Sequence, residues 1–87
     1  MRYTVLLIRD PEGGYVARVP ALPGCVTEGD DLPEALDNAR EAILAYIESL
    51  ALDGVPAPND KPVIELYEDE KEAWAIRVAV KEETAVA

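Results

Sequence analysis

One segment limits what this chain of 87 residues can fold into, because residues 31–53 have the pattern of a single long amphipathic helix. Asp31 is suited to cap its N-terminus, and Glu34, three residues later, completes a capping box. Gly54 supplies the stop. Apolar residues recur at helical spacing along one face and predict its contact with a core: Leu32, Ala35, Leu36, Ala39, Ile43, Tyr46, Ile47 and Leu50.

Segments rich in β-forming residues lie on both sides of this helix. Residues 2–9 and 15–19 predict a hairpin, and residues 25–28 predict a third, short strand after a corner rich in proline. Residues 73–80 alternate between apolar and other side chains and predict a last strand. Residues 63–72 fit a strand, a short helix or an acidic excursion.

The order β-β-β-α-β predicts an α+β fold, in which one helix packs on one face of an antiparallel meander. The last strand is expected beside the first and parallel to it, after the helical crossover. A chain of this length is expected to form one domain, residues 1–87, and to gain stability from oligomerisation. One helix covers only one sheet face, yet strand 2–9 is apolar towards both. Leu6 and Ile8 are therefore candidate partner contacts, with cover by residues 55–72 as the alternative.

Composition argues against an enzyme and against a membrane protein. The chain has one cysteine and no histidine, so Cys25 is predicted to be a small buried hydrophobe and not a nucleophile. No apolar stretch is long enough for a membrane span, and no signal peptide precedes the first strand, so a cytoplasmic location is expected. We predict no catalytic residue and no cofactor.

Carboxylates at the ends of the predicted strands are the one candidate for a metal site. Asp10, Glu12, Glu28, Asp30 and Asp31 could cluster there and bind Mg²⁺. Turn and capping duties explain Asp10 and Asp31 without a metal, so no metal ligand is predicted. The aromatic residues, Trp74 among them, are expected to pack in the core, because they are too dispersed among acids for base stacking.

The net charge of −10 is concentrated in the middle of the chain. Residues 30–53 carry one basic and seven acidic side chains, whereas residues 1–29 are neutral. Such a distribution repels nucleic acid and favours a basic protein partner, although solubility alone would also explain it. The acidic side of the predicted helix, Asp37, Glu41 and Glu48, is a second candidate for partner contacts.

Short motifs mark the predicted hairpin turn, the corner before the third strand and the start of the helix: Gly13, Gly14, Tyr15, Pro20, Leu22, Pro23, Gly24, Cys25, Gly29, Glu34 and Ala35. Together they are similar to the motifs of the HicB-like antitoxin family. The resemblance covers residues 1–54 well and residues 73–80 more loosely. These motifs are predicted to be structural, with glycines in tight turns and prolines shaping the corner before the third strand.

The resemblance implies a partial ribonuclease-H-like fold without a working nuclease site. It also implies a protein-binding module that masks a toxin of the HicA type, a small basic RNA-cleaving protein. Many relatives carry a further C-terminal DNA-binding segment; only residues 81–87 follow the last strand here, so no direct nucleic-acid binding is expected. A homo-oligomer, dimer or tetramer, is expected. The alternatives are an orphan oligomeric scaffold or ligand-binding domain without a toxin, and a Mg-dependent nuclease remnant.

Overall fold

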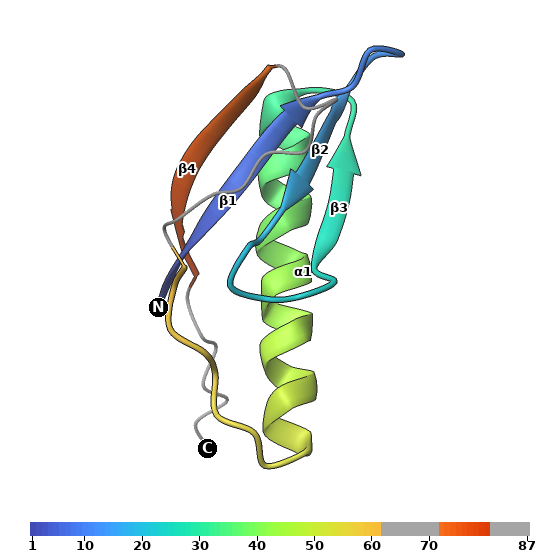
Figure 1. Cartoon of the computed structure of the whole chain (residues 1–87). Helices are drawn as coiled ribbons and strands as arrows, with labels where there is room; N and C mark the ends of the chain where they lie inside the picture. Colours follow the sequence, from blue (N-terminus) through green and yellow to red (C-terminus); the bar gives the residue numbers. More distant parts are fainter. Residues whose placement is uncertain (62–71, 81–87) are drawn as a thin grey trace.

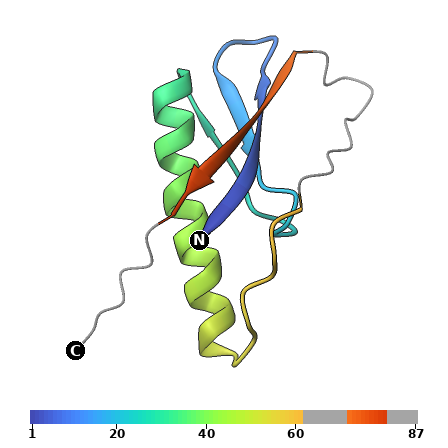
Figure 2. The same cartoon turned by 90° about the vertical axis from the view of Figure 1, so that its left-hand side faces the viewer.

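The computed structural model describes residues 1–61 and 72–80. Within them the chain forms one antiparallel sheet in the strand order β3-β2-β1-β4, with one helix across one face (Figures 1 and 2). The predicted α+β fold and its element order are confirmed. The elements are β1 (Arg2–Arg9), β2 (Tyr15–Arg18), β3 (Val26–Gly29), α1 (Leu32–Leu52) and β4 (Ala73–Ala79).

The predicted direction of the last strand is wrong. β4 lies beside β1, as expected, but the two strands run antiparallel. At one end of this pair the Arg9 N–H donates to the Glu72 carbonyl (2.9 Å), and at the other the Val80 N–H donates to the Met1 carbonyl (2.8 Å). β4 therefore starts where β1 finishes, whereas α1 ends beyond the opposite end of the sheet (Figure 1). Because the end of α1 and the start of β4 lie at opposite ends of the sheet, β4 runs antiparallel to β1.

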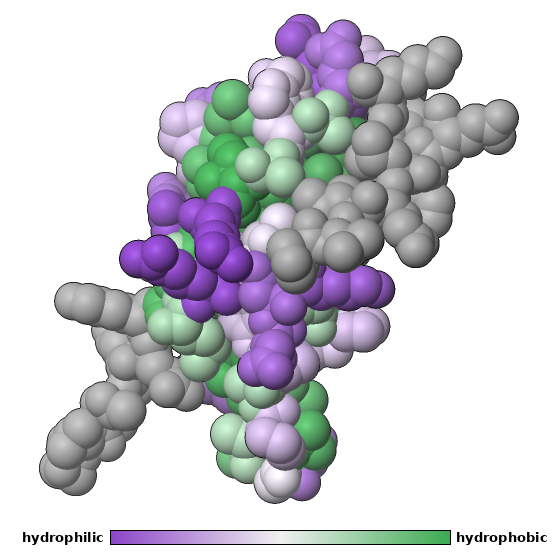
Figure 3. All heavy atoms as spheres, turned by 60° about the vertical axis from the view of Figure 1, so that its left-hand side comes forward, coloured by the Kyte–Doolittle hydropathy of each residue, from purple (hydrophilic) through white to green (hydrophobic). Residues whose placement is uncertain are grey.

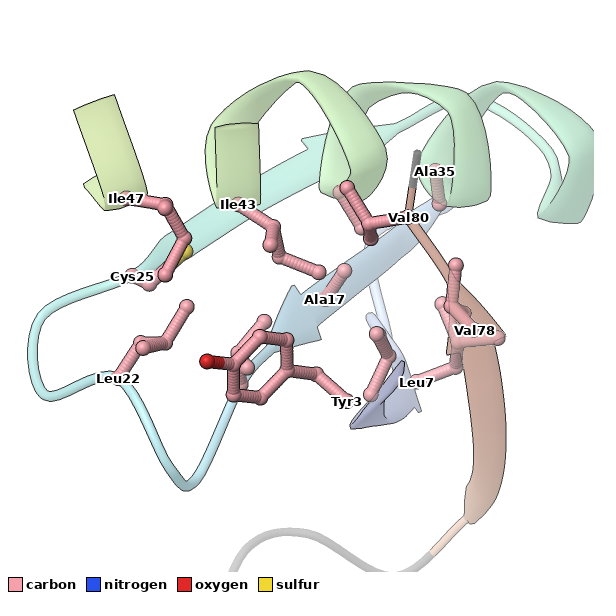
Figure 4. Packing of buried hydrophobic residues seen from close by; sticks show 13 residues of the cluster. Tyr3, Leu7, Ala17, Leu22, Cys25, Ala35, Ile43, Ile47, Val78 and Val80 are labelled. Atoms are coloured by element: carbon pink, nitrogen blue, oxygen red, sulfur yellow. The ribbon is translucent and has the colours of Figure 1, made fainter. Parts of the chain in front are cut away.

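The core lies between α1 and the sheet (Figure 4). Ile43 is fully buried at the middle of the helix, and Leu22 reaches the same cluster from the loop between β2 and β3. Leu32, expected on the buried face, is 36% exposed, because it lies at the helix start, outside the cluster. Apolar side chains of β1, β2, α1 and β4, of that loop and of Val80 make up the cluster: Tyr3, Val5, Leu7, Ala17, Val19, Leu22, Cys25, Ala35, Ala39, Ile43, Ile47, Val78 and Val80.

The helix begins with the predicted capping arrangement. Asp31 is the N-cap, and its Oδ1 accepts a hydrogen bond from the Glu34 N–H (2.9 Å). The Glu34 carboxylate in turn accepts from the Asp30 N–H (2.6 Å), one residue before the position that a standard capping box uses. The Asp31 carboxylate therefore satisfies a backbone donor that the helix end leaves without a partner, and the Glu34 carboxylate satisfies the donor of the residue before the cap.

Close packing joins the start of α1 to β3. Gly29 has no positive φ, but a Cβ added there would lie 2.4 Å from the Ala35 nitrogen. The Asn38 side chain donates to the Glu28 carbonyl at 2.8 Å and holds the next turn of the helix to the same strand. The missing side chain at Gly29 is therefore what allows the helix backbone to approach the sheet here.

A compact loop connects β2 to β3 and supplies part of the core. The Cys25 N–H donates to the Leu22 carbonyl (2.9 Å), Gly24 has a φ of +83°, and the Tyr46 hydroxyl donates to the Pro23 carbonyl (2.8 Å). Cys25 is 5% exposed and unpaired, and its burial raises the pKa of the thiol. Its predicted buried position is confirmed.

Asp60 ties the chain after α1 to the first half of β1. Its carboxylate accepts hydrogen bonds from the N–H and the hydroxyl of Thr4, both at 2.8 Å, and lies 3.5 Å from Arg77 Nε. Burial raises the pKa of Asp60, but the hydrogen bonds from Thr4, the Lys61 N–H and Arg77 outweigh it, so the pKa lies below its ordinary value.

Asp60→Ala is expected to lower the free energy of unfolding by about 2 kcal/mol at neutral pH, because the N–H of Thr4, a buried residue, loses its partner. A lowered pKa stabilises the fold above the unfolded-state value of about 3.9. The difference between wild type and variant should therefore be full near pH 7 and shrink as the pH falls through the lower folded-state pKa of Asp60. Urea unfolding followed by circular dichroism at pH 7 and near pH 3 measures it; a difference independent of pH would contradict this role.

Candidate functional site

Three carboxylates form an acidic helix face on the side of α1 that points away from the sheet. These residues, Asp37, Glu41 and Glu48, are all exposed, and their spacing of four and seven places them in one stripe. Arg40 Nη1 lies 3.0 Å from Asp37 Oδ1, but the two side chains are 47% and 75% exposed, so this ion pair neutralises little. Glu41 and Glu48 make no ion pair with another residue of the described ranges.

The chemistry available on this face is recognition by charge. Solvent-exposed carboxylates in a row produce a negative potential that accelerates the encounter with a basic surface. With charges of this kind along one side, α1 is not apolar enough to cross a membrane, and no other helix occurs in the described residues.

Leu6 and Ile8 lie on the sheet face opposite α1. Their neighbours Val5 and Leu7 point into the core, so alternation along β1 sends Leu6 and Ile8 to the other side. The two side chains are only 2% and 8% exposed. They are therefore buried within the chain itself, and a contact with a partner would require this cover to move.

The suspected acidic cluster is brought together only in part. Asp10, Glu28 and Asp30 line a cleft of about 440 Å³ at the end of the sheet where α1 begins, whereas Glu12 and Asp31 do not line it. Among residues 1–61 and 72–80, no group of three acidic, cysteine or histidine side chains is placed to hold a metal ion. The other lining residues are Gly13, Gly14, Tyr15, Thr27, Gly29, Glu34 and Asn38.

The paired glycines of the hairpin occupy positions that favour glycine. Gly13 and Gly14 have φ values of +108° and +76°. The Gly13 N–H donates to the Asp10 carbonyl and the Asp10 N–H to the Gly14 carbonyl, both at 3.0 Å. A Cβ on Gly14 would also lie 2.8 Å from the Gly29 carbonyl oxygen. These conformations and contacts support a structural role for the two glycines. That the motif takes no part in binding stays a prediction.

Two large apolar side chains of β4 are more exposed to solvent than the alternating pattern of this strand indicated. We call Trp74 and Ile76 the apolar edge; they are 43% and 37% exposed, so the expectation that Trp74 packs in the core is wrong. α1 packs mainly on β3 and β2 and leaves β4 at the side. A helix about 10 Å wide does not cover four strands roughly 4.8 Å apart. Tyr15 meets Trp74 edge-on, with ring centres 6.1 Å apart.

Comparison with known proteins places these features in a family. A family model described as a HicB-like antitoxin of bacterial toxin–antitoxin systems matches residues 3–85. A UPF0150 protein of Thermoplasma acidophilum is 53% identical over 60 residues, which are 69% of this chain and 87% of that protein. The antitoxin HicB of Escherichia coli is 37% identical over 62 residues, covering 67% of this chain but only 45% of the antitoxin.

Solved structures agree with these sequence matches. The N-terminal domain of the Burkholderia pseudomallei antitoxin HicB superposes with a TM-score of 0.73 at 26% identity, over 94% of this chain and 100% of that one. A chain of the HicA3 and HicB3 toxin–antitoxin complex superposes with a TM-score of 0.71 at 25% identity, over the same shares.

Proposed function

Because this chain belongs to the HicB-like antitoxin family of bacterial toxin–antitoxin systems, we propose that it binds and masks a small basic toxin of the HicA type. The observation that carries the proposal is its similarity to a chain of the HicA3 and HicB3 complex, over 100% of that chain. The net charge of −10 supports a basic partner. In this proposal the protein acts by stoichiometric binding in the cytoplasm, without catalysis and without direct contact to nucleic acid.

We assign the first contact with the toxin to the acidic helix face. Its carboxylates are exposed, and the two that lack an ion pair with a described residue, Glu41 and Glu48, lie two helical turns apart. A basic surface approaching the outer side of α1 meets this stripe first, because the sheet lies on the opposite side of the helix (Figure 2). Leu6 and Ile8 join the interface only if the cover over the opposite face opens on binding.

The test is a double charge reversal, Glu41→Lys with Glu48→Lys. The association rate with the basic HicA-type toxin that this proposal expects a neighbouring gene to encode should fall about tenfold or more at low salt, because attraction at this face becomes repulsion. Stopped-flow or surface plasmon measurements at two salt concentrations record it, and the difference should shrink at high salt.

The matched control is Glu12→Lys with Glu28→Lys, which changes the net charge equally at two exposed residues away from the acidic helix face. It should slow association much less. Equal slowing by both doubles would remove the acidic helix face from the interface. A neighbouring basic protein that fails to bind the wild-type chain at all would overturn the proposed function itself.

A further inference from the structure

The end of α1 projects beyond the sheet and carries an exposed leucine. In Figures 1 and 2 the last turns of the helix extend past the strands. Leu52, the last helical residue, is 89% exposed, and Val55 in the following loop is 46% exposed; we call these two residues the helix tip. Among the large apolar side chains of the described residues, the next most exposed after Leu52 is Val26, at 54%. A leucine this open adds almost nothing to the core of its own chain.

The backbone at the helix tip is closed by hydrogen bonds. Gly54 has a φ of +71°, and its N–H donates to the Ala51 carbonyl at 3.1 Å. The Val55 N–H donates to the Leu50 carbonyl at 2.8 Å. Together these two bonds form a Schellman motif, which satisfies carbonyls that a frayed helix end would leave to water. A partner that binds the helix tip therefore does not have to order its backbone first, and this lowers the entropic cost of binding.

The helix tip continues the acidic helix face. Leu52 follows Glu48 by four residues and Glu41 by eleven, so the three side chains lie in one stripe on the outer side of α1. Ala45, which is exposed, lies in the same stripe between the two glutamates. The last turn has no basic residue and ends at Asp53, so the surroundings of Leu52 are negative. Figure 3 shows hydrophobic and hydrophilic surface side by side at the lower end of the molecule, where α1 ends.

We propose that the helix tip is the apolar anchor of the toxin interface, and that Leu52 inserts into an apolar pocket bordered by Lys or Arg side chains of the toxin. This inference rests on the proposed function and adds the place where the complex is held. Exposed carboxylates such as Glu41 and Glu48 accelerate the encounter, but exposed ion pairs add little to the stability of a complex. Burial of a leucine supplies what they lack, and an apolar centre with a charged rim is the usual composition of a protein interface.

Charge selects a basic protein as the occupant of the helix tip. If a second copy of this chain met it tip to tip, Glu48, Asp53 and the carbonyl end of the helix would face the same groups of the other copy, and like charges repel. An anionic lipid surface is repelled in the same way. A basic partner, in contrast, is attracted by all of these groups while it covers the leucine.

Leu52→Ala should raise the dissociation constant of the complex with the basic HicA-type toxin that the proposed function expects about tenfold or more, because less apolar surface is buried on binding. The effect should appear as faster dissociation, with the association rate within about twofold of wild type, since the charges that steer the encounter stay in place. The double charge reversal of Glu41 and Glu48 should do the opposite and slow association. Surface plasmon measurements give both rates for each variant.

Two further variants are the controls. Val26→Ala shortens an exposed apolar side chain of β3, away from the outer side of α1, and should leave both rates unchanged. Leu52→Met keeps an apolar side chain of similar volume and should bind nearly as wild type does. Urea unfolding checks that all three variants keep the stability of the wild-type chain, as expected for exposed positions.

The outcomes separate this inference from the proposed function. A wild-type chain that binds the toxin while Leu52→Ala binds it equally well removes the helix tip from the interface and leaves the proposed function standing. Equal weakening by Val26→Ala and Leu52→Ala also contradicts the anchor. Light scattering covers the other occupant: a wild-type dimer that Leu52→Ala abolishes would assign the helix tip to a second copy and overturn the proposal. A wild-type chain that binds no such toxin overturns both the function and the anchor.

Discussion

Gly29→Ala is expected to lower the free energy of unfolding by about 3 kcal/mol, because the new methyl group meets backbone atoms that have no rotamer with which to move aside. Its Cβ would lie 2.4 Å from the nitrogen and 2.7 Å from the Cα of Ala35. The start of α1 would have to move away from β3, and the acidic helix face would move with it. Guanidinium unfolding measures the change, and the melting temperature should fall by about 15 °C.

Gly24→Ala is the control that separates close approach from backbone conformation. Gly24 has a φ of +83°, so alanine is strained there, but nothing lies within 4 Å of the added Cβ. This variant should lose only about 1 kcal/mol. Equal losses for Gly24→Ala and Gly29→Ala would mean that the contact between β3 and Ala35 does not limit the packing of the helix.

Ile43→Ala is expected to lower the free energy of unfolding by about 3 kcal/mol, through lost apolar burial and the cavity that remains. Ile43 is fully buried at the middle of the helix, facing the sheet in Figure 4. Leu52→Ala is the matched control, since Leu52 lies on the same helix but is 89% exposed, and its removal should change stability by less than about 0.5 kcal/mol. A similar loss for both would place the core elsewhere.

Sequence patterns correctly predicted the helix and strands whose bounds depend on interactions between residues close in the sequence. The bounds of α1 agree with the predicted 31–53 to within a residue at each end, because Asp31, Glu34 and Gly54 act on their own neighbours. β1 agrees residue for residue with the predicted 2–9. The ambiguous residues 63–72 lie outside the described ranges, apart from Glu72.

Features that depend on the placement of distant elements were not predictable in the same way. The direction of β4 depends on the end of the sheet at which this strand begins, for which no short motif exists. Trp74 and Val78 occupy equivalent positions in one alternating pattern, yet one is 43% and the other 2% exposed, because β4 runs obliquely and only its C-terminal end lies close to α1 (Figure 2). Asp60 was missed since its partner, Thr4, is 56 residues away and no local signal marks the pair.

In the candidate site, too, some features were predictable from the sequence and others were not. Periodicity alone placed Asp37, Glu41 and Glu48 together on the outer side of α1, and the structure exposes all three. The apolar run of β1 indicated that Leu6 and Ile8 point away from the helix. Whether they are buried there depends on how distant parts of the chain pack, so the burial of Leu6 and Ile8 and the exposure of the apolar edge became clear only from the structure.

The pairing of β1 with β4 also has a consequence for synthesis on the ribosome. Arg2 lies opposite Ala79, so β1 waits for the distant β4 to emerge before its own pairing is complete. β2, β3 and α1 can assemble on the nascent polypeptide in the meantime, but one edge of β1 stays unpaired until β4 has been synthesised. Closure of so long a loop is slow compared with hairpin formation. The newly made protein therefore passes through a period in which chaperones and proteases can reach its central strand.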